Sequence, residues 1–302
     1  MNVVSRMLRP MANVVRRHPA LARSALACIP DWHTHITVPQ IGKVRIRLRR
    51  NRSLWLRPPL ELELYPLATL RAFVRPTDIV WDVGANLGIY ARWLVTHLKA
   101  RHVCSFEPMA ENIPELRHNL VLGNVTERVT VVPWALSNVD SVVDFQVDDM
   151  QSASGAVNSV YNGEACRARA ALGLPPKIEK VKSRTIDSIL TAGELPPPDV
   201  LKIDVEGAER MLLDGGEAFF RRASPRLLIE THGLDVSRQC LEFLFDHGYT
   251  VAARVPAHWH AECHMKLDRS VLGRMVDQYD AHFIAAAKRP EDVPDKLDLV
   301  NL

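Results

Sequence analysis

The sequence lacks the features that mark several classes of protein. Its five cysteines form no Cys-x-x-Cys pair, which disfavours a disulfide-stapled secreted fold and favours a reducing, cytoplasmic location. No apolar run approaches the roughly 18 residues that a membrane-spanning helix needs. Arg and Pro residues at positions 16, 17, 19 and 23 interrupt the one stretch that resembles a signal peptide. With 302 residues, 47% of them hydrophobic, the chain can bury one large core.

A strong overall charge is also absent, because the formal net charge is only +3. The charges are nevertheless unevenly divided. Residues 1–57 contain twelve Lys and Arg and a single acid, Asp31, for a net charge of +11, whereas the rest has 26 basic and 34 acidic residues, for a net charge of −8. We predict that the basic front end either meets an anionic partner or docks on the acidic body of the same chain.

Residues 1–60 are predicted to form an N-terminal extension. Pro10, Pro19 and Pro30 divide its first half into short helices. Apolar and basic residues then alternate over residues 43–49, which predicts a strand with one exposed, basic face. Residues 53–56 are predicted to be the hairpin partner of this strand.

Residues 61–288 are predicted to form one domain, because short apolar strands alternate with helices, as in a parallel α/β sheet. The expected strands cover residues 79–83, 102–106, 129–133, 200–204 and 227–230. The expected helices cover residues 88–98, 110–122, 184–190 with Ser183 as the N-cap, and 208–221. Residues 142–182 interrupt the alternation and are predicted to be an inserted strand with a mobile loop, a candidate lid. The polar residues 289–302 are predicted to be a peripheral tail.

A glycine-rich turn follows the first of these strands and opens a helix. In residues 80–88, VWDVGANLG, Gly84 and Gly88 allow the backbone to approach a ligand, and free amides at the helix start can bind polar atoms. Glu107 lies 19 residues beyond Gly88, at the end of the next strand. This spacing places a carboxylate where it can accept both hydroxyls of an adenosine ribose.

Two missing motifs narrow the choice of ligand. The turn has no G-x-G-x-x-G pattern, and no Tyr is followed four residues later by Lys, so a nicotinamide cofactor is disfavoured. Asp82, at the strand end, suits a positively charged ligand such as S-adenosylmethionine (SAM), whose amino group and sulfonium need acidic neighbours. We therefore predict SAM as the cofactor.

A second segment carries charged residues at the same edge of the sheet. Residues 199–209, DVLKIDVEGAE, predict a strand that ends in a cluster of acids, at the edge where open α/β sheets bind ligands. Glu206 and Glu209 also fit the ordinary preference of a helix start for acids. Lys202 and Asp204 are explained less well in that way and are predicted to be catalytic.

Four segments, DVGANLG, FEP, PDVLKIDVEGAE and LLIETHG, resemble in this order the FkbM-type family of SAM-dependent methyltransferases, as does the Ile186-Asp187 pair in SRTIDSIL. The resemblance covers about residues 60–255. It implies the class I methyltransferase fold, a Rossmann-like α/β architecture whose seven-stranded sheet has its last strand antiparallel. It also implies methyl transfer to a hydroxyl of a sugar, a glycan or a polyketide-like small molecule.

Within this reading, we predict that Asp204 faces the transferred methyl and acts as the general base or orients the acceptor hydroxyl. His232 is the alternative base, because imidazole titrates near neutrality, and a buried structural role fits it as well. The predicted donor contacts are Asp82, Gly84, Ala85, Asn86 and Gly88 around the methionine part, Glu107 and Pro108 near the ribose, and Ala135 and Leu136 beside the adenine.

Two groups of residues resemble metal ligands, but we expect no metal. Asp204, Glu206 and Glu230 offer oxygens suited to Mg²⁺, although Glu side chains at a helix start are more often solvated. The second group lies in residues 258–264, HWHAECH, and comprises His258, His260, Cys263 and His264. Its spacing matches no zinc pattern, so an extended loop at the rim is expected.

The basic residues 1–57 have three possible interpretations. An RNA methyltransferase would use its arginines for phosphates, but no D-P-P-Y-like motif follows the strand that ends at Asp204, so nucleic acid is disfavoured. Residues 1–57 are also suited to peripheral contact with an anionic membrane. We favour the third interpretation, a basic edge strand packed on the acidic body. A non-catalytic SAM-binding module is the remaining alternative function, and the oligomeric state stays open.

Overall fold

The computed structural model describes residues 31–51, 54, 64–148, 154–157, 175–257, 261–273 and 283–297. The helices predicted between Pro10, Pro19 and Pro30 lie outside the described residues, as do most of residues 53–56 and the last part of the predicted tail.

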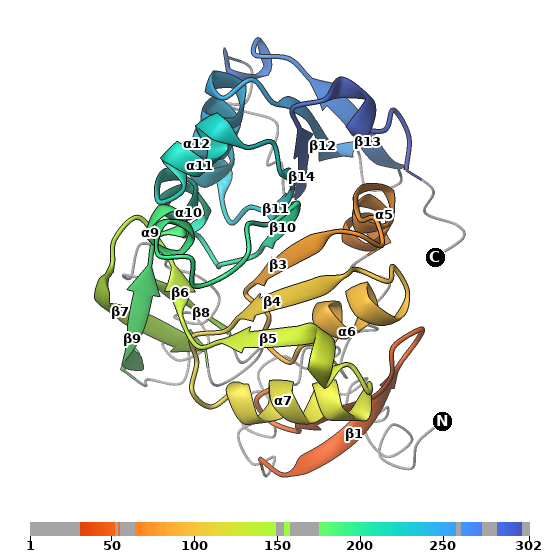
Figure 1. Ribbon diagram of the computed structural model, residues 1–302, viewed down its shortest axis with the longest axis vertical. Coiled ribbons are helices and arrows are strands. Elements are labelled where there is room, and N and C mark those ends of the chain that lie inside the picture. Colours follow the sequence, from red (N-terminus) through yellow and green to blue (C-terminus); the bar gives the residue numbers. More distant parts are fainter. Residues whose placement is uncertain are drawn as a thin grey trace, which may run out of the picture.

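The described chain is built on a sheet of eight strands in the order β13-β12-β14-β11-β10-β3-β4-β5 (Figure 1). These strands are β3 (Ile79–Val83), β4 (His102–Phe106), β5 (Val129–Val132), β10 (Val200–Ile203), β11 (Arg226–Glu230), β12 (Thr250–Ala257), β13 (Ala261–Leu267) and β14 (Phe283–Ala287). All five strands predicted from apolar runs are present and parallel to one another. Their near-complete burial explains why they read as continuous apolar runs rather than as an alternating pattern.

The last strand, β14, lies antiparallel between β11 and β12, which confirms the predicted fold class. The sheet differs from the seven-stranded expectation in one respect, because β13 adds an eighth strand beside β12. β13 contains Cys263 and His264, so this part of the segment expected to be an extended loop is paired in a sheet. His258 and His260 lie outside the described residues.

Helices cover both faces of the sheet, as Figure 1 shows. On one face, α5 (Leu64–Phe73), α6 (Ile89–Thr96) and α7 (Ile113–Leu122) pack on one half of the alternating strand side chains, including Val80, Val103 and Val200. On the other face, four helices pack on the opposite half, including Trp81, Phe106 and Ile203. These are α9 (Ile186–Thr191), α10 (Glu209–Asp214), α11 (Glu217–Arg222) and α12 (Leu234–Asp246).

The predicted helix ends differ from the structure by up to three residues, as at the start of α7, and two further differences have a visible cause. The helix expected over residues 208–221 is divided into α10 and α11 at Gly215 and Gly216. A Cβ at Gly215 would lie 2.0 Å from the carbonyl oxygen of Ser137, so close packing of the backbone breaks the helix there. The N-cap of α9 is Thr185 rather than Ser183, because the Thr185 hydroxyl accepts a hydrogen bond of 3.0 Å from the Ser188 amide.

The described part of the predicted insertion forms a second sheet rather than a lone strand. Its strands β6 (Ala135–Leu136), β7 (Ser141–Asp148), β8 (Ser154–Val157) and β9 (Ile178–Arg184) pair in the order β6-β9-β7-β8. Val143, Phe145 and Val147 alternate along β7 and are buried with Met109 and Ala208 of the main domain. This part of the insertion is a packed wall, and the predicted mobile loop falls on residues that the structure does not describe.

The predicted basic strand is β2 (Gly42–Arg47), but its partner is β1 (His33–Val38) rather than residues 53–56. Apolar residues of this hairpin bury against α6 and α7. Its basic face meets acidic side chains: Arg45 Nε lies 2.6 Å from Glu115 Oε2 on α7, and Arg47 Nη1 lies 3.2 Å from Asp31 Oδ2. The described arginines therefore pack on the chain's own acids, as the third interpretation expects.

The segment after residue 289 is attached to the domain over its described part. It contains the short helix η2 (Pro290–Asp292), and Val293 is buried against Ala252 and Ala287. Arg75 and Asp292 form an ion pair of 2.7 Å. Residues 289–297 of the predicted peripheral tail therefore lie against the domain and are held there by Val293 and Asp292. Among the residues described, no helix combines the length and the apolar character needed to cross a membrane.

Candidate active site

The glycine-rich turn after β3 has a backbone that only some residues tolerate. Gly84 and Gly88 have φ angles of +80° and +73°, and Asn86 has φ +47°. The amides of Gly84 and Ala85 both donate to the carbonyl oxygen of Phe106, at 3.1 and 2.9 Å. These bonds fix the turn against the end of β4, where the second predicted motif begins.

Glu107 follows β4 and is held by two backbone amides. Its Oε2 accepts a hydrogen bond of 2.8 Å from Asn86, and its Oε1 accepts one of 2.9 Å from Met109. Burial raises the pKa of this carboxyl to about 7 although both amides lower it. Glu107 therefore joins the two motifs physically, and each of its oxygens still has a lone pair with which to accept a ligand hydroxyl.

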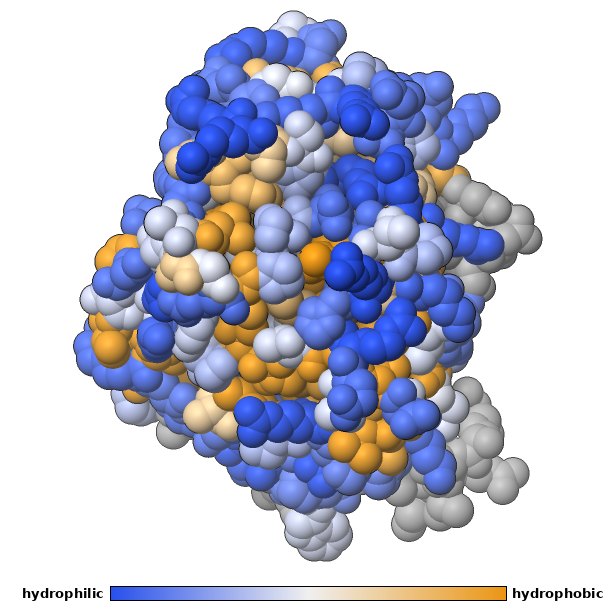
Figure 2. Space-filling view, in the orientation of Figure 1, coloured by the Kyte–Doolittle hydropathy of each residue, from blue (hydrophilic) through white to orange (hydrophobic). Residues whose placement is uncertain are grey.

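A pocket of about 600 Å³, counted with the open space at its mouth, lies at the carboxyl edge of the sheet. Figure 2 shows apolar side chains gathered in the middle of this face of the molecule, with hydrophilic ones around them. The pocket is lined by Val83, Gly84, Asn86, Phe106, Glu107, Pro108, Trp134, Ala135, Leu136, Phe145, Gly155, Val157, Asp204, Val205 and Glu206.

Most of the predicted donor contacts line this pocket: Gly84, Asn86, Glu107, Pro108, Ala135 and Leu136. Asp82, Ala85 and Gly88 lie in the same turn but are not among the lining residues. The sequence did not indicate that Trp134 lines the pocket, nor that Phe145 and Val157 of the inserted sheet form one of its walls. The alternation along β7 signalled a buried face, but nothing local showed that this face borders the ligand pocket.

Asp82 and Lys202 form a buried pair directly behind the pocket. They are register partners on β3 and β10, and both are almost fully buried. Neither oxygen of Asp82 accepts a hydrogen bond of good geometry, and Lys202 Nζ lies 3.8 Å from Asp82 Oδ1 and 3.2 Å from Asp204 Oδ2. Burial raises the pKa of Asp82. Burial lowers that of Lys202, but the neighbouring carboxylates outweigh it and raise the pKa overall, so the ammonium keeps its charge.

His232 lies beside Asp204, and Glu209 holds its ring from the opposite side. Its Nδ1 is 2.8 Å from Glu209 Oε1, and its Nε2 is 3.6 Å from Glu206 Oε2 and 3.8 Å from Asp204 Oδ1. Burial lowers the pKa of His232, but the bond to Glu209 and the surrounding carboxylates raise it to about 10. This differs from the near-neutral titration on which a role as the base depends.

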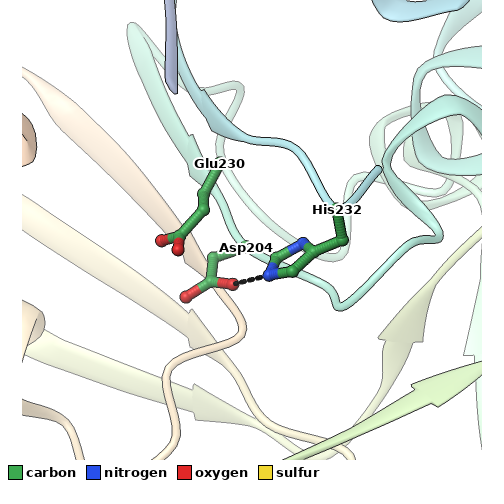
Figure 3. Close-up of side chains that lie close together, drawn as sticks. All are labelled: Asp204, Glu230 and His232. Carbon is green, nitrogen blue, oxygen red and sulfur yellow. Dashed lines mark ion pairs between the residues drawn. The ribbon is translucent and has the colours of Figure 1, made fainter. Parts of the chain in front are cut away.

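Three side chains at the sheet edge could hold a cation. Ligand atoms of Asp204, Glu230 and His232 all lie within 4.8 Å of one another, and Figure 3 shows the two carboxylates and the imidazole directed toward a shared space. The sequence had suggested Glu206 where the geometry places His232. In the second candidate group, His264 contacts Tyr65 Oη through Nδ1 (2.9 Å) and the carbonyl oxygen of Pro294 through Nε2 (2.7 Å), so both ring nitrogens have partners in the chain.

Comparison with known proteins agrees with the family that the motifs indicated. A family model described as the methyltransferase FkbM domain matches residues 82–251. The chain is 26% identical over 203 residues to the hexuronic acid methyltransferase AglP of Haloferax volcanii, covering 63% of this chain and 75% of the relative. It is 27% identical over 221 residues to the 31-O-demethyl-FK506 methyltransferase FkbM of Streptomyces tacrolimicus, covering 66% of this chain and 84% of that one.

Among solved structures, a methyltransferase FkbM from Methylobacillus flagellatus matches with a TM-score of 0.43 and 16% identity, covering 91% of this chain and 60% of that chain. The family model alone spans more than half of the sequence and includes the DVGANLG segment and residues 199–209. The protein therefore belongs to the FkbM methyltransferase family.

Proposed function

We propose that the protein is a SAM-dependent O-methyltransferase that acts on a hydroxyl of a sugar, a glycan or a polyketide-like small molecule. The observation that carries the proposal is the position of Asp204, which lines the same pocket as the glycine-rich turn and Glu107. Two relatives are named for a hexuronic acid and for an O-demethylated FK506, which supports a hydroxyl of an oxygen-rich molecule as the acceptor.

The residues present fit SAM. Gly84 allows a ligand to approach the backbone at the turn, and Glu107 offers acceptor oxygens to ribose hydroxyls. Trp134, Ala135 and Leu136 supply an apolar wall for adenine. Asp82 adds a buried carboxylate whose oxygens accept no hydrogen bond of good geometry, and its negative charge favours a cationic ligand nearby.

SAM supplies a methyl group on a positively charged sulfur, and this carbon–sulfur bond breaks as the acceptor oxygen bonds to the carbon. Asp204 takes the proton that the acceptor hydroxyl gives up, so that a neutral ether remains. Lys202 holds Asp204 Oδ2 at 3.2 Å, which fixes the carboxylate in one orientation. The rest of the pocket contributes by holding donor and acceptor in line.

The experiment combines donor binding with turnover. Calorimetric titration of the purified chain with SAM tests the pocket, and mass spectrometry of uronic-acid glycans and macrolide alcohols incubated with methyl-labelled SAM tests the acceptor class. Label in an ether of one acceptor supports the proposal. Absence of SAM binding would refute the donor assignment, and label only in RNA or only on nitrogen would refute the acceptor class.

Asp204→Asn separates the two roles of the site. We expect this variant to bind SAM within about twofold of the wild type and to lose turnover by on the order of 10²- to 10⁴-fold, the range of general acid–base catalysis. Asp144→Asn is the matched control, because Asp144 is exposed on β7 and pairs only at the surface with Lys180. Normal turnover in Asp204→Asn would remove the base assignment.

A further inference from the structure

Glu209 was explained from the sequence as an ordinary acid at a helix start, but its surroundings are unusual. It is the first residue of α10 and is 0% exposed. Its Oε1 accepts hydrogen bonds from the Gly207 amide at 3.0 Å and from His232 Nδ1 at 2.8 Å. A solvated acid that only complements a helix dipole needs neither the burial nor the imidazole partner.

The hydrogen bond between Glu209 and Nδ1 of His232 sets the direction in which Nε2, on the opposite side of the ring, points. A hydrogen bond at Nδ1 fixes the ring orientation and the tautomer, and it leaves Nε2 directed at Asp204 and Glu206, which lie 3.8 and 3.6 Å away. Both of these residues line the pocket, whereas Glu209 does not. Glu209 therefore acts on the pocket through its partners, and His232 is the partner that faces Asp204.

We propose that Glu209 is a positioning residue that keeps His232 a cation with Nε2–H facing Asp204, so that Asp204 stays ionised and oriented to accept the proton of the acceptor hydroxyl. The proposal deepens the proposed function and rests on the role of Asp204 in it. In this proposal His232 is not an alternative base. It is a fixed positive charge beside the base, Asp204.

The charged groups around His232 support this role from each packed element. Asp204 and Glu206 approach from the loop after β10, Glu209 from α10, and Glu230 from β11, all as acids. The cation nearest to Asp204 is Lys202, on β10. From α12, Cys240 faces Glu209 as a neutral thiol because burial raises its pKa. Burial opposes the charge on the ring, because it lowers the pKa of His232, and Glu209, at 2.8 Å, is the closest of the acids that offset it.

The direct test is an NMR titration of the ring nitrogens of His232 in the wild-type full-length chain. We expect both nitrogens to stay protonated through neutral pH and to titrate near pH 10. In Glu209→Gln we expect the titration to move to lower pH, because Nδ1–H loses its carboxylate partner while Asp204 and Glu206 remain beside Nε2. A wild-type His232 that titrates near 6.5 would overturn the proposal without any variant, so a folding defect in Glu209→Gln cannot hide the answer.

The kinetic test measures the pH dependence of kcat, which a merely structural role of Glu209 would not change. In Glu209→Gln we expect SAM affinity to stay within about twofold, kcat to fall on the order of a hundredfold at neutral pH, and the alkaline decline of kcat to begin at a lower pH than in the wild type. Asp214→Asn is the control, because it makes the same change at an exposed site on α10 that pairs with Arg210. Unchanged pH profiles in both variants would overturn the proposal. Failure to bind SAM would contradict the proposed function, while the titration would still decide the role of Glu209.

Discussion

The backbone of Gly84 touches that of Asp204: a Cβ at position 84 would lie 1.8 Å from the carbonyl oxygen of Asp204. The Asp204 amide in turn donates to the carbonyl oxygen of Val83 at 3.1 Å. The turn proposed to hold the donor and the residue proposed to receive the proton are therefore joined by main-chain contact. Their separation is set by the pairing of β3 with β10, not by flexible side chains.

This contact predicts that Gly84→Ala is far more harmful than an alanine at another positive-φ glycine. We expect Gly193→Ala to cost about 1 kcal/mol of unfolding free energy, because Gly193 has φ +65° and nothing within 4 Å of a new Cβ. Gly84→Ala adds a backbone overlap and is expected to cost about 3 kcal/mol or more and to abolish SAM binding. Urea denaturation and calorimetry measure both effects, and equal costs for the two variants would contradict the contact.

The buried pair behind the pocket predicts a second stability effect. Lys202→Met leaves the carboxylate of Asp82 buried without its cation, so we expect a loss of about 3–5 kcal/mol in the free energy of unfolding. The double variant Lys202→Met/Asp82→Asn should recover a large part of this loss, since it removes the uncompensated charge. Lys180→Met removes a surface ion pair with Asp144 and should cost less than about 1 kcal/mol. If Lys202→Met lowers the free energy of unfolding no more than Lys180→Met does, the buried pair does not contribute the expected stability.

The sequence predicted best those features that depend on local patterns. The apolar runs of β3, β4 and β10 and the acids at their ends follow from local chemistry, because parallel strands share one ligand-binding edge. The helix break at Gly215 was not predictable, since it depends on Ser137, far away along the chain. The same limit applies to β1, whose pairing with β2 was not predicted from the sequence.

The candidate site shows this limit most clearly at Glu209. A Glu in the first turn of a helix is explained locally by its favourable interaction with the helix dipole. The contact that indicates a further role is with His232, which lies 23 positions further along the chain. The wall formed by Phe145 and Val157 is a similar case. The motifs therefore pointed to the turn and to Glu107, whereas tertiary packing was needed to find Glu209 and the wall residues.

Glu107 predicts a pH dependence of stability in the absence of SAM. Burial raises its pKa from an ordinary value near 4.5 to about 7, so the folded state binds this proton more tightly than the unfolded state does. Stability from Glu107 is therefore present below pH 4.5 and is lost as the pH rises toward 7, by up to about 3 kcal/mol. Urea denaturation at pH 5 and 7.5 should show this fall in the wild type and a smaller one in Glu107→Gln, while identical falls would contradict the assignment.

Removal of divalent metal predicts no loss of turnover. Asp204, Glu230 and His232 lie close enough together to ligate an ion, but Lys202 already places a positive charge 3.2 Å from Asp204. His232 adds a second positive charge, because its pKa is raised to about 10. Two resident cations weaken the attraction of this edge for a third. We expect turnover after dialysis against EDTA to match the untreated enzyme and added Mg²⁺ to change it less than twofold. Loss of turnover that Mg²⁺ restores in the wild type but not in Glu230→Gln would instead identify the three residues as metal ligands, and Glu242→Gln, an exposed change on α12, is the control for that comparison.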